Sequence, residues 1–216
     1  LNTLAVFSAK NLIPERKNNM QAQRRYIILF FNLFFLTIFS SAGIIRVPED
    51  QPGIQMGIDA ANSSDTVLVA PGEYFENIVF NKNIILGSKF LTTGDTAFIS
   101  QTIINADSNG IVVDVVSVTF PSRIVGFTIT KGKAEEGAGI RMKGSQITVE
   151  YVRLINNFSE CENSSSGAAV FALNSVLRLK NFVVDSNLAL CESPAINSQG
   201  GAIYARNTEL YLTNGL

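Results

Sequence analysis

The sequence predicts an all-β solenoid, in which one short unit of strands is repeated and stacked on its neighbours. Two observations carry this prediction. Short runs rich in Val, Ile, Leu and Phe alternate with turns rich in Gly, Asn and Ser after residue 61. One apolar pattern also returns at similar intervals along the second half of the chain. A unit this small cannot bury its own apolar side chains, so stacking between units must create the core.

The repeat consists of two series that keep the same phase. In the first, the segment 124–129 (Ile-x-x-Phe-x-Ile) matches segments that begin at Val149, Leu179 and Leu212. The second series consists of tetrapeptides rich in Gly and Ala: 137–140, 167–170 and 200–203. The interval differs slightly from unit to unit, which indicates loops of different length at one corner. We expect the apolar positions to form buried ladders, and the small residues to lie where the backbone turns tightly.

Asn157 and Asn187 fall at the same distance beyond the first glycine of their repeats. Side chains of asparagine at equivalent positions can stack and hydrogen-bond to each other, so we expect an asparagine ladder there. A β-sandwich is the alternative fold, because it also contains many short strands. It predicts two-residue hairpin turns, and no Asn-Gly pair is flanked by matching strands.

The N-terminal region is typical of a secretory signal peptide over residues 20–42. Arg24 and Arg25 precede an apolar run from Tyr26 to Phe39, and small residues follow it. A membrane-spanning helix is the alternative, but it needs about 20 apolar residues. Residues 1–19 are expected to be a non-native upstream extension. Residues 43–216 form the predicted β domain, which we expect to be truncated at its C-terminus because the chain stops inside a repeat.

The start of the predicted domain combines one helix with several strands. Residues 52–61 place Ile54, Ile58 and Ala61 at helical spacing, which predicts a short amphipathic helix. Apolar runs that are typical of strands follow it, separated by turns: 66–70, 78–80 and 84–87.

The segment Asp65–Ile78 (Asp-Thr-Val-Leu-Val-Ala-Pro-Gly-Glu-Tyr-Phe-Glu-Asn-Ile) resembles the first coil of right-handed parallel β-helix proteins of the pectin-lyase-like superfamily. The segment is also similar to secreted β-helix repeat proteins of environmental bacteria. Residues 200–203 (Gly-Gly-Ala-Ile) are also similar to a repeat motif of chlamydial polymorphic outer-membrane proteins. The resemblance implies a right-handed parallel β-helix over residues 46–216, with the helix at 52–61 as its N-terminal cap. It implies little about activity, because the superfamily contains lyases, hydrolases, esterases and adhesins.

Composition narrows the possible chemistry. The chain has no histidine, which excludes Ser-His-Asp triads and His-ligated metals. Residues 43–216 carry 12 basic and 17 acidic residues, a net charge of −5, so nucleic acid is not an expected partner.

A polysaccharide lyase would need a carboxylate cluster for Ca²⁺ beside an Arg or Lys base. The available residues are Asp107, Asp114, Arg123, Lys131, Glu135, Glu136 and Arg141. A solvated acidic turn is the simpler reading of Glu135 and Glu136.

The two cysteines, Cys161 and Cys191, are separated by the same offset as Gly137 and Gly167, the first glycines of their repeats. We therefore expect them at one corner of adjacent coils, with Cα atoms about 4.8 Å apart. This spacing and an oxidising compartment predict a Cys161–Cys191 disulfide. Two free thiols are the alternative.

Three sequons begin at Asn62, Asn157 and Asn163, and chance explains them in a chain this rich in Asn and Ser. Tyr74, Phe75 and Tyr151 are aromatic residues that sugars could stack on, but we expect them to pack inward.

We predict a secreted or cell-surface protein, extracellular or on a bacterial outer membrane, with a structural, adhesive or glycan-binding role. The alternative is a polysaccharide lyase or glycoside hydrolase, and Ca²⁺ is expected only under that alternative. No catalytic, cofactor-binding or metal-ligating residue is predicted. A polysaccharide or cell-surface glycan is the expected partner, with no membrane span after the signal is removed.

Overall fold

A computed structural model describes residues 42–161, 167–191 and 201–216. The predicted upstream extension and residues 20–41 of the predicted signal peptide lie outside these ranges. The described residues form mainly short strands, with three short helices. Every pairing between two named strands in these ranges is parallel. The predicted strand-rich class and parallel pairing are therefore confirmed, and the hairpins that a β-sandwich requires are not found in the described ranges.

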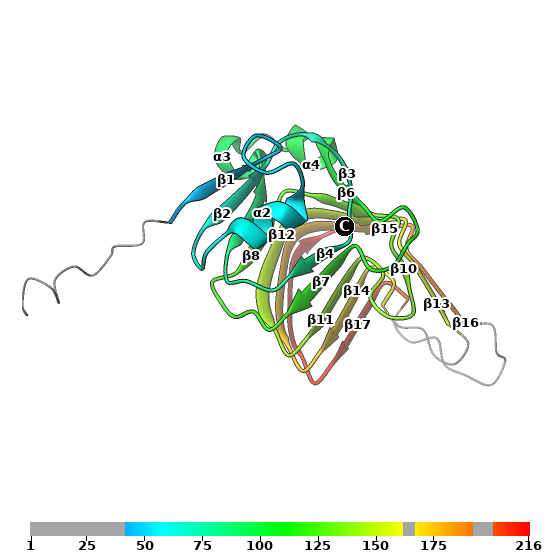
Figure 1. Ribbon diagram of the computed structural model, residues 1–216. Helices are drawn as coiled ribbons and strands as arrows, with labels where there is room; N and C mark the ends of the chain where they lie inside the picture. The colour runs from blue at the N-terminus through cyan, green and yellow to red at the C-terminus, as the bar shows by residue number, and fades with distance from the viewer. Residues whose placement is uncertain (1–41, 162–166, 192–200) are drawn as a thin grey trace, which may run out of the picture. The chain divides into compact units, whose positions relative to one another are not determined.

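The largest sheet contains ten strands in two rows (Figure 1). One row follows the order β1 (Ile44–Val47), β2 (Thr66–Val69), β5 (Ile85–Ser88), β8 (Arg123–Val125), β12 (Gln146–Ile155), β15 (Val176–Asp185) and β18 (Glu209–Gly215). The other row contains β3 (Gly72–Phe75), β6 (Thr102–Asn105) and β9 (Thr128–Thr130). The long strand β12 joins them, because its first half pairs with β8 and its second half with β9.

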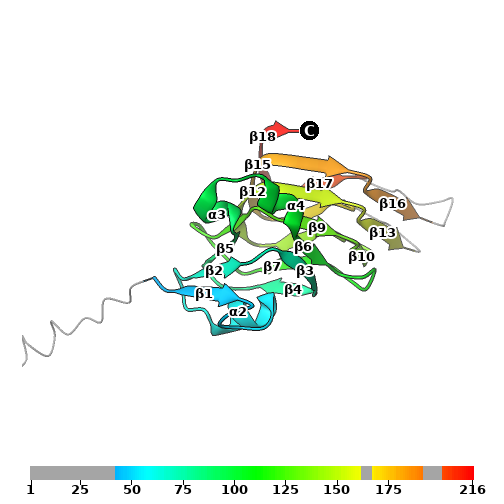
Figure 2. The ribbon, with the colours of Figure 1, turned by 90° about the horizontal axis from the view of Figure 1, so that it is seen from above.

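Two smaller sheets complete the arrangement. A five-stranded sheet contains β4 (Ile78–Phe80), β7 (Val113–Val116), β11 (Ile140–Lys143), β14 (Val170–Leu173) and β17 (Ile203–Arg206). A three-stranded sheet contains β10 (Lys133–Ala134), β13 (Phe158–Cys161) and β16 (Leu188–Cys191). Neighbours in each sheet come from successive repeats of the chain, so the strands of one kind lie side by side in sequence order (Figures 1 and 2).

The strand register confirms both series of the repeat. Val149 pairs with Ile124 of the preceding repeat and with Leu179 of the following one. In the five-stranded sheet, Val170 pairs with both Ile140 and Ile203. These are the same pairs of positions that match each other in the sequence. Residues separated by one repeat therefore meet across strands.

The core is the set of these ladders. Ile124, Val149 and Leu179 are fully buried, as are Ile140 and Val170. Each apolar residue of a strand is stacked on an apolar residue of the next, which removes both from water. Burying a side chain of this size contributes roughly 1.5–3 kcal/mol, so the ladders are the main source of stability.

The predicted helix at 52–61 is present as α2 (Ile54–Ala60), with Ile54 and Ile58 buried in the core. The backbone N–H groups of Ile54 and Gln55 donate to the carboxylate oxygens of Glu76, both at 2.8 Å. A carboxylate satisfies the free amide groups of a helix N-terminus. Glu76 comes from the connection between β3 and β4, so it ties the helix to the first strands.

The sequence did not predict the two other helices, α3 (Phe90–Thr93) and α4 (Ala97–Gln101), which are inserted between β5 and β6. They lie against the largest sheet (Figure 2). Gly126 makes the close approach possible: a Cβ atom there would lie 2.4 Å from Ser88 Oγ and 2.9 Å from Phe90 Cβ. Phe90 in turn packs on Tyr151, with ring centroids 4.4 Å apart.

Candidate functional site

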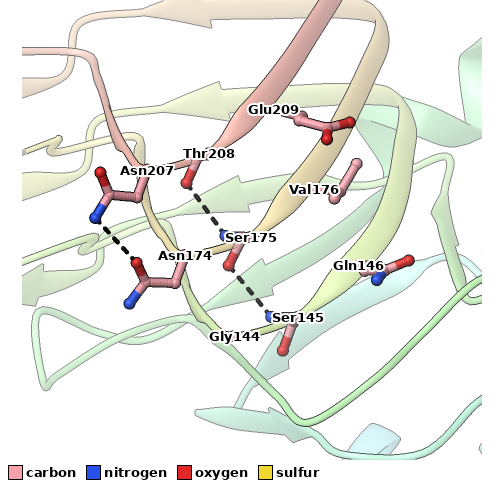
Figure 3. Close-up of a pocket in the computed structure, with 9 residues that line it drawn as sticks. All are labelled: Gly144, Ser145, Gln146, Asn174, Ser175, Val176, Asn207, Thr208 and Glu209. Atoms are coloured by element: carbon pink, nitrogen blue, oxygen red, sulfur yellow. Dashed lines mark hydrogen bonds between the residues drawn. The ribbon is translucent and has the colours of Figure 1, made fainter.

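A hollow lined by polar residues lies where the five-stranded sheet connects to the largest one (Figure 3). It has a volume of about 460 Å³. Three successive connections line it, and we call it the polar hollow: 144–146, 174–176 and 207–209. Because these connections are equivalent positions of successive repeats, their side chains form rows.

The backbone of each connection needs a residue that tolerates a left-handed conformation. Gly144, Asn174 and Asn207 have φ values of 60°, 51° and 49°. Glycine adopts this region without a steric penalty, and asparagine is the next most tolerant residue. The choice of Gly and Asn at these positions is therefore explained by the sharp turn between the sheets.

A hydroxyl ladder fixes the inner side of the polar hollow. The N–H of Ser145 donates to Ser175 Oγ at 3.2 Å, and the N–H of Ser175 donates to Thr208 Oγ1 at 3.3 Å. Beside it, Asn207 Nδ2 donates to Asn174 Oδ1 at 3.2 Å. These bonds join three repeats and hold the amide groups of the asparagines at a defined spacing (Figure 3).

The outer side of the polar hollow carries polar side chains that are not part of the hydroxyl ladder or of the asparagine pair. Gln146, Val176 and Glu209 occupy one register row across β12, β15 and β18. The Glu209 carboxylate accepts a hydrogen bond from the Tyr211 hydroxyl at 3.1 Å. The carboxylate and the phenol thus lie together on β18, and the Gln146 amide lines the same hollow from β12, so the surface offers both donors and acceptors.

Next to the polar hollow, the guanidinium of Arg178 packs against two aromatic rings. We call this group of Phe120, Arg178 and Tyr211 the arginine stack. The Arg178 guanidinium lies 3.9 Å from the ring centroid of Phe120 and 5.3 Å from that of Tyr211. Arg178 follows Val176 by two positions on β15, so both are on the same face of the strand. Within the described residues Arg178 has no carboxylate partner, and the two aromatic rings hold its guanidinium in place.

The charged residues considered for a lyase do not converge. Asp114 and Arg141 are register partners and form a bidentate pair, with Nε–Oδ1 at 3.0 Å and Nη2–Oδ2 at 2.5 Å. The hydrogen bonds that the Arg141 guanidinium donates to this carboxylate raise the pKa of Arg141. Glu136 pairs with Lys143 at 2.9 Å. These charges neutralise each other in pairs on the five-stranded sheet.

The remaining candidates lie elsewhere. Arg123 pairs with Glu150 on the largest sheet. Asp107 and Lys131 are exposed turn residues with positive φ, at the ends of β6 and β9. Glu135 is exposed, and its backbone carbonyl accepts a hydrogen bond from Ser159 Oγ at 2.5 Å. Within the described ranges, no group of three or more Cys, Asp or Glu side chains is arranged to hold a metal ion.

The aromatic residues noted in the sequence have different environments. Tyr74 packs against the core and donates to the Ala70 carbonyl at 2.9 Å. Tyr151 is half-buried against Phe90. The prediction of inward packing is wrong for Phe75, which is 62% exposed. Phe75 lies on the face of β3 opposite to Tyr74, because successive residues of a strand point to opposite faces.

The sequons also differ. Asn62 is exposed, whereas Asn157 is 1% exposed and its amide is bonded inside the asparagine ladder. The Asn157 sequon is therefore inaccessible in the folded chain. Asn163 lies outside the described residues.

The backbone places Cys161 and Cys191 in register at the ends of β13 and β16. This confirms that they occupy equivalent positions of adjacent repeats. Their side chains lie outside the described part of the structure, so the disulfide stays a prediction.

Among the described residues, no helix is long and apolar enough to cross a membrane. The comparisons with known proteins identify no relative of this chain: no family model, no curated protein and no solved structure matches it.

Proposed function

We propose that the chain is a right-handed parallel β-helix that is exported and binds glycans at the polar hollow and the arginine stack. Parallel pairing at the repeat offsets supports the solenoid, since each repeat contributes one strand to each row. The α2 helix supports a cap, because its apolar face covers the first buried ladder. The signal-like segment at 20–42 supports export.

The observation that carries glycan binding is the juxtaposition of planar and polar groups at one surface. A sugar ring presents an apolar face and a rim of hydroxyl groups. Tyr211 offers a flat face that is 49% exposed, and its hydroxyl is bonded to the Glu209 carboxylate. Gln146 offers a further hydrogen-bonding group in the same hollow as Glu209. Ligand sites in proteins combine apolar contact with a few placed polar groups in this manner.

The rigidity of the scaffold favours the same function. The residues on the outer side of the polar hollow lie on β12, β15 and β18. Backbone pairing joins β15 to both of the other strands. A site built on strands loses little conformational entropy when it binds. Equivalent positions of successive repeats also follow one another at a regular spacing of about 4.8 Å, which suits a polymer lying along the rows.

The test is a screen of the purified protein against neutral and acidic glycans, followed by titration of each glycan that binds. Replacing Tyr211 by Ala is expected to weaken binding about tenfold, equivalent to roughly 1.4 kcal/mol. Gln146→Ala removes one polar group and is expected to weaken it less. The matched control is Phe75→Ala, because Phe75 is another exposed aromatic residue on β3, away from the polar hollow.

Two results would contradict the proposal. One is binding that falls as much in Phe75→Ala as in Tyr211→Ala. The other is release of unsaturated products from an acidic polysaccharide in the presence of Ca²⁺, which would identify a lyase instead.

A further inference from the structure

The three-stranded sheet brings the two cysteines of the chain to the same position of neighbouring strands. In the parallel pair β13–β16, Phe158 pairs with Leu188, and the register continues to Cys161 and Cys191. Neighbouring strands lie about 4.7–4.9 Å apart. Disulfides accept Cα separations of about 4.4–6.8 Å, so the strand spacing falls inside that range.

The register of this pair is held by contacts just before it. The N–H of Asn157 donates to Asn187 Oδ1 at 3.0 Å, and Asn157 Nδ2 donates to the same oxygen at 2.9 Å. The N–H of Leu188 donates to the Asn157 carbonyl at 3.0 Å. A slip of one residue would break these bonds, and it would also place the two cysteines on opposite faces of the sheet.

We infer that Cys161 and Cys191 form a disulfide that joins β13 to β16 at their C-terminal ends. This inference is independent of glycan binding. Two thiols lose two protons and two electrons as the S–S bond forms, and a small-molecule or protein disulfide accepts them and is reduced to two thiols. The reaction requires an oxidising compartment, as expected for an exported chain.

The bond would close the part of the chain between the two strand ends. Residues 162–190 would then be a covalent loop that contains β14 and β15, which belong to two other sheets. A cross-link of this kind restricts the unfolded chain and so favours the folded one. The expected result is a higher melting temperature for the oxidised protein than for the same protein after reduction.

The experiment incubates the folded protein in a buffer of oxidised and reduced glutathione, then alkylates it and measures its intact mass. Circular dichroism before alkylation verifies that the protein is folded. We expect most molecules to lack alkylatable thiols, to weigh two hydrogens less than the reduced form, and to yield a peptide that links Cys161 to Cys191. Two alkylated thiols in the folded protein would overturn the inference.

A register-shifted variant provides the control. In the double substitution Cys191→Ser and Leu190→Cys, the thiol moves by one residue to the other face of β16. We expect this variant to keep two alkylatable thiols under the same conditions. If it cross-links as readily as the original protein, the register does not determine the pairing and the inference fails.

Discussion

Asn157 provides the sharpest test of the stacked arrangement, because it is a buried polar residue bonded to both neighbouring repeats. Its Oδ1 accepts from the Gly132 N–H at 3.0 Å, and its Nδ2 donates to the Ile129 carbonyl at 3.2 Å. The same Nδ2 donates to Asn187 Oδ1 at 2.9 Å. Replacing Asn157 by Ala removes all three bonds and leaves buried partners unsatisfied.

The expected cost follows from these bonds. Each contributes about 0.5–1.5 kcal/mol net, so their loss is expected to lower the free energy of unfolding by about 3 kcal/mol. A domain of this size gains or loses about 2–4 °C of melting temperature per kcal/mol, which predicts a decrease of roughly 6–12 °C. Asn187→Ala, at a half-buried position, is expected to cost less.

The assay is urea denaturation followed by two spectroscopic probes, with the double-mutant cycle of Asn157 and Asn187. We expect a coupling of about 1 kcal/mol, because the two amides bond directly. Asn109→Ala is the control, since Asn109 is exposed and is expected to change stability by less than about 0.5 kcal/mol. A loss below about 0.5 kcal/mol in Asn157→Ala would refute the ladder as a source of stability.

Three further predictions concern other parts of the chain. Thr102→Val is expected to raise the free energy of unfolding by about 1 kcal/mol in a thermal melt, because the Thr102 hydroxyl is buried without a partner in the described residues; a loss of stability would contradict this reading. Gly126→Ala is expected to cost more than about 1 kcal/mol, since φ is 86° and a Cβ would collide with Ser88 and Phe90; an unchanged urea midpoint would contradict it. Hydrogen bonds from the backbone N–H groups of Gly43 and Asn62 lower the pKa of Asp65 from its ordinary 3.8. The stability from Asp65 is therefore present above that ordinary value and lost as pH falls through the lowered one, so the difference between wild type and Asp65→Asn should shrink in acid; a constant difference from neutral pH to strong acid would contradict the assignment.

The repeat could be predicted from the sequence because its period is carried by residues that have to be apolar. Val149 and Leu179 occupy a buried ladder, so the need to pack leaves a visible pattern at the repeat offset. The helix α2 was predictable for the same reason, since Ile54 and Ile58 face the core.

The insertion α3–α4 could not be predicted, because helices of four and five residues carry no measurable period. The sequence contains only an indirect sign of the insertion, which is the glycine at position 126. Phe90 packs closely against Gly126, and this contact can be recognised only in the structure. Phe75 was misassigned because a run of aromatic residues does not reveal which face of a short strand is outward.

The polar hollow was missed although a signal was present. Asn174-Ser175 and Asn207-Thr208 are separated by the same offset as Leu179 and Leu212 of the apolar series around them. Reading polar residues by the same offset would have placed them in one row. The arginine stack leaves no such trace, because Phe120 reaches Arg178 from a connection that does not repeat.

The most direct test of the central claim is a measurement of through-space contacts by solution NMR. The stacked arrangement predicts nuclear Overhauser effects between β12 and β15 at the repeat offset, including Val149 with Leu179 and Leu154 with Val184. Contacts that instead join strands adjacent in the sequence, in the antiparallel pattern of hairpins, would contradict the stacked parallel repeat.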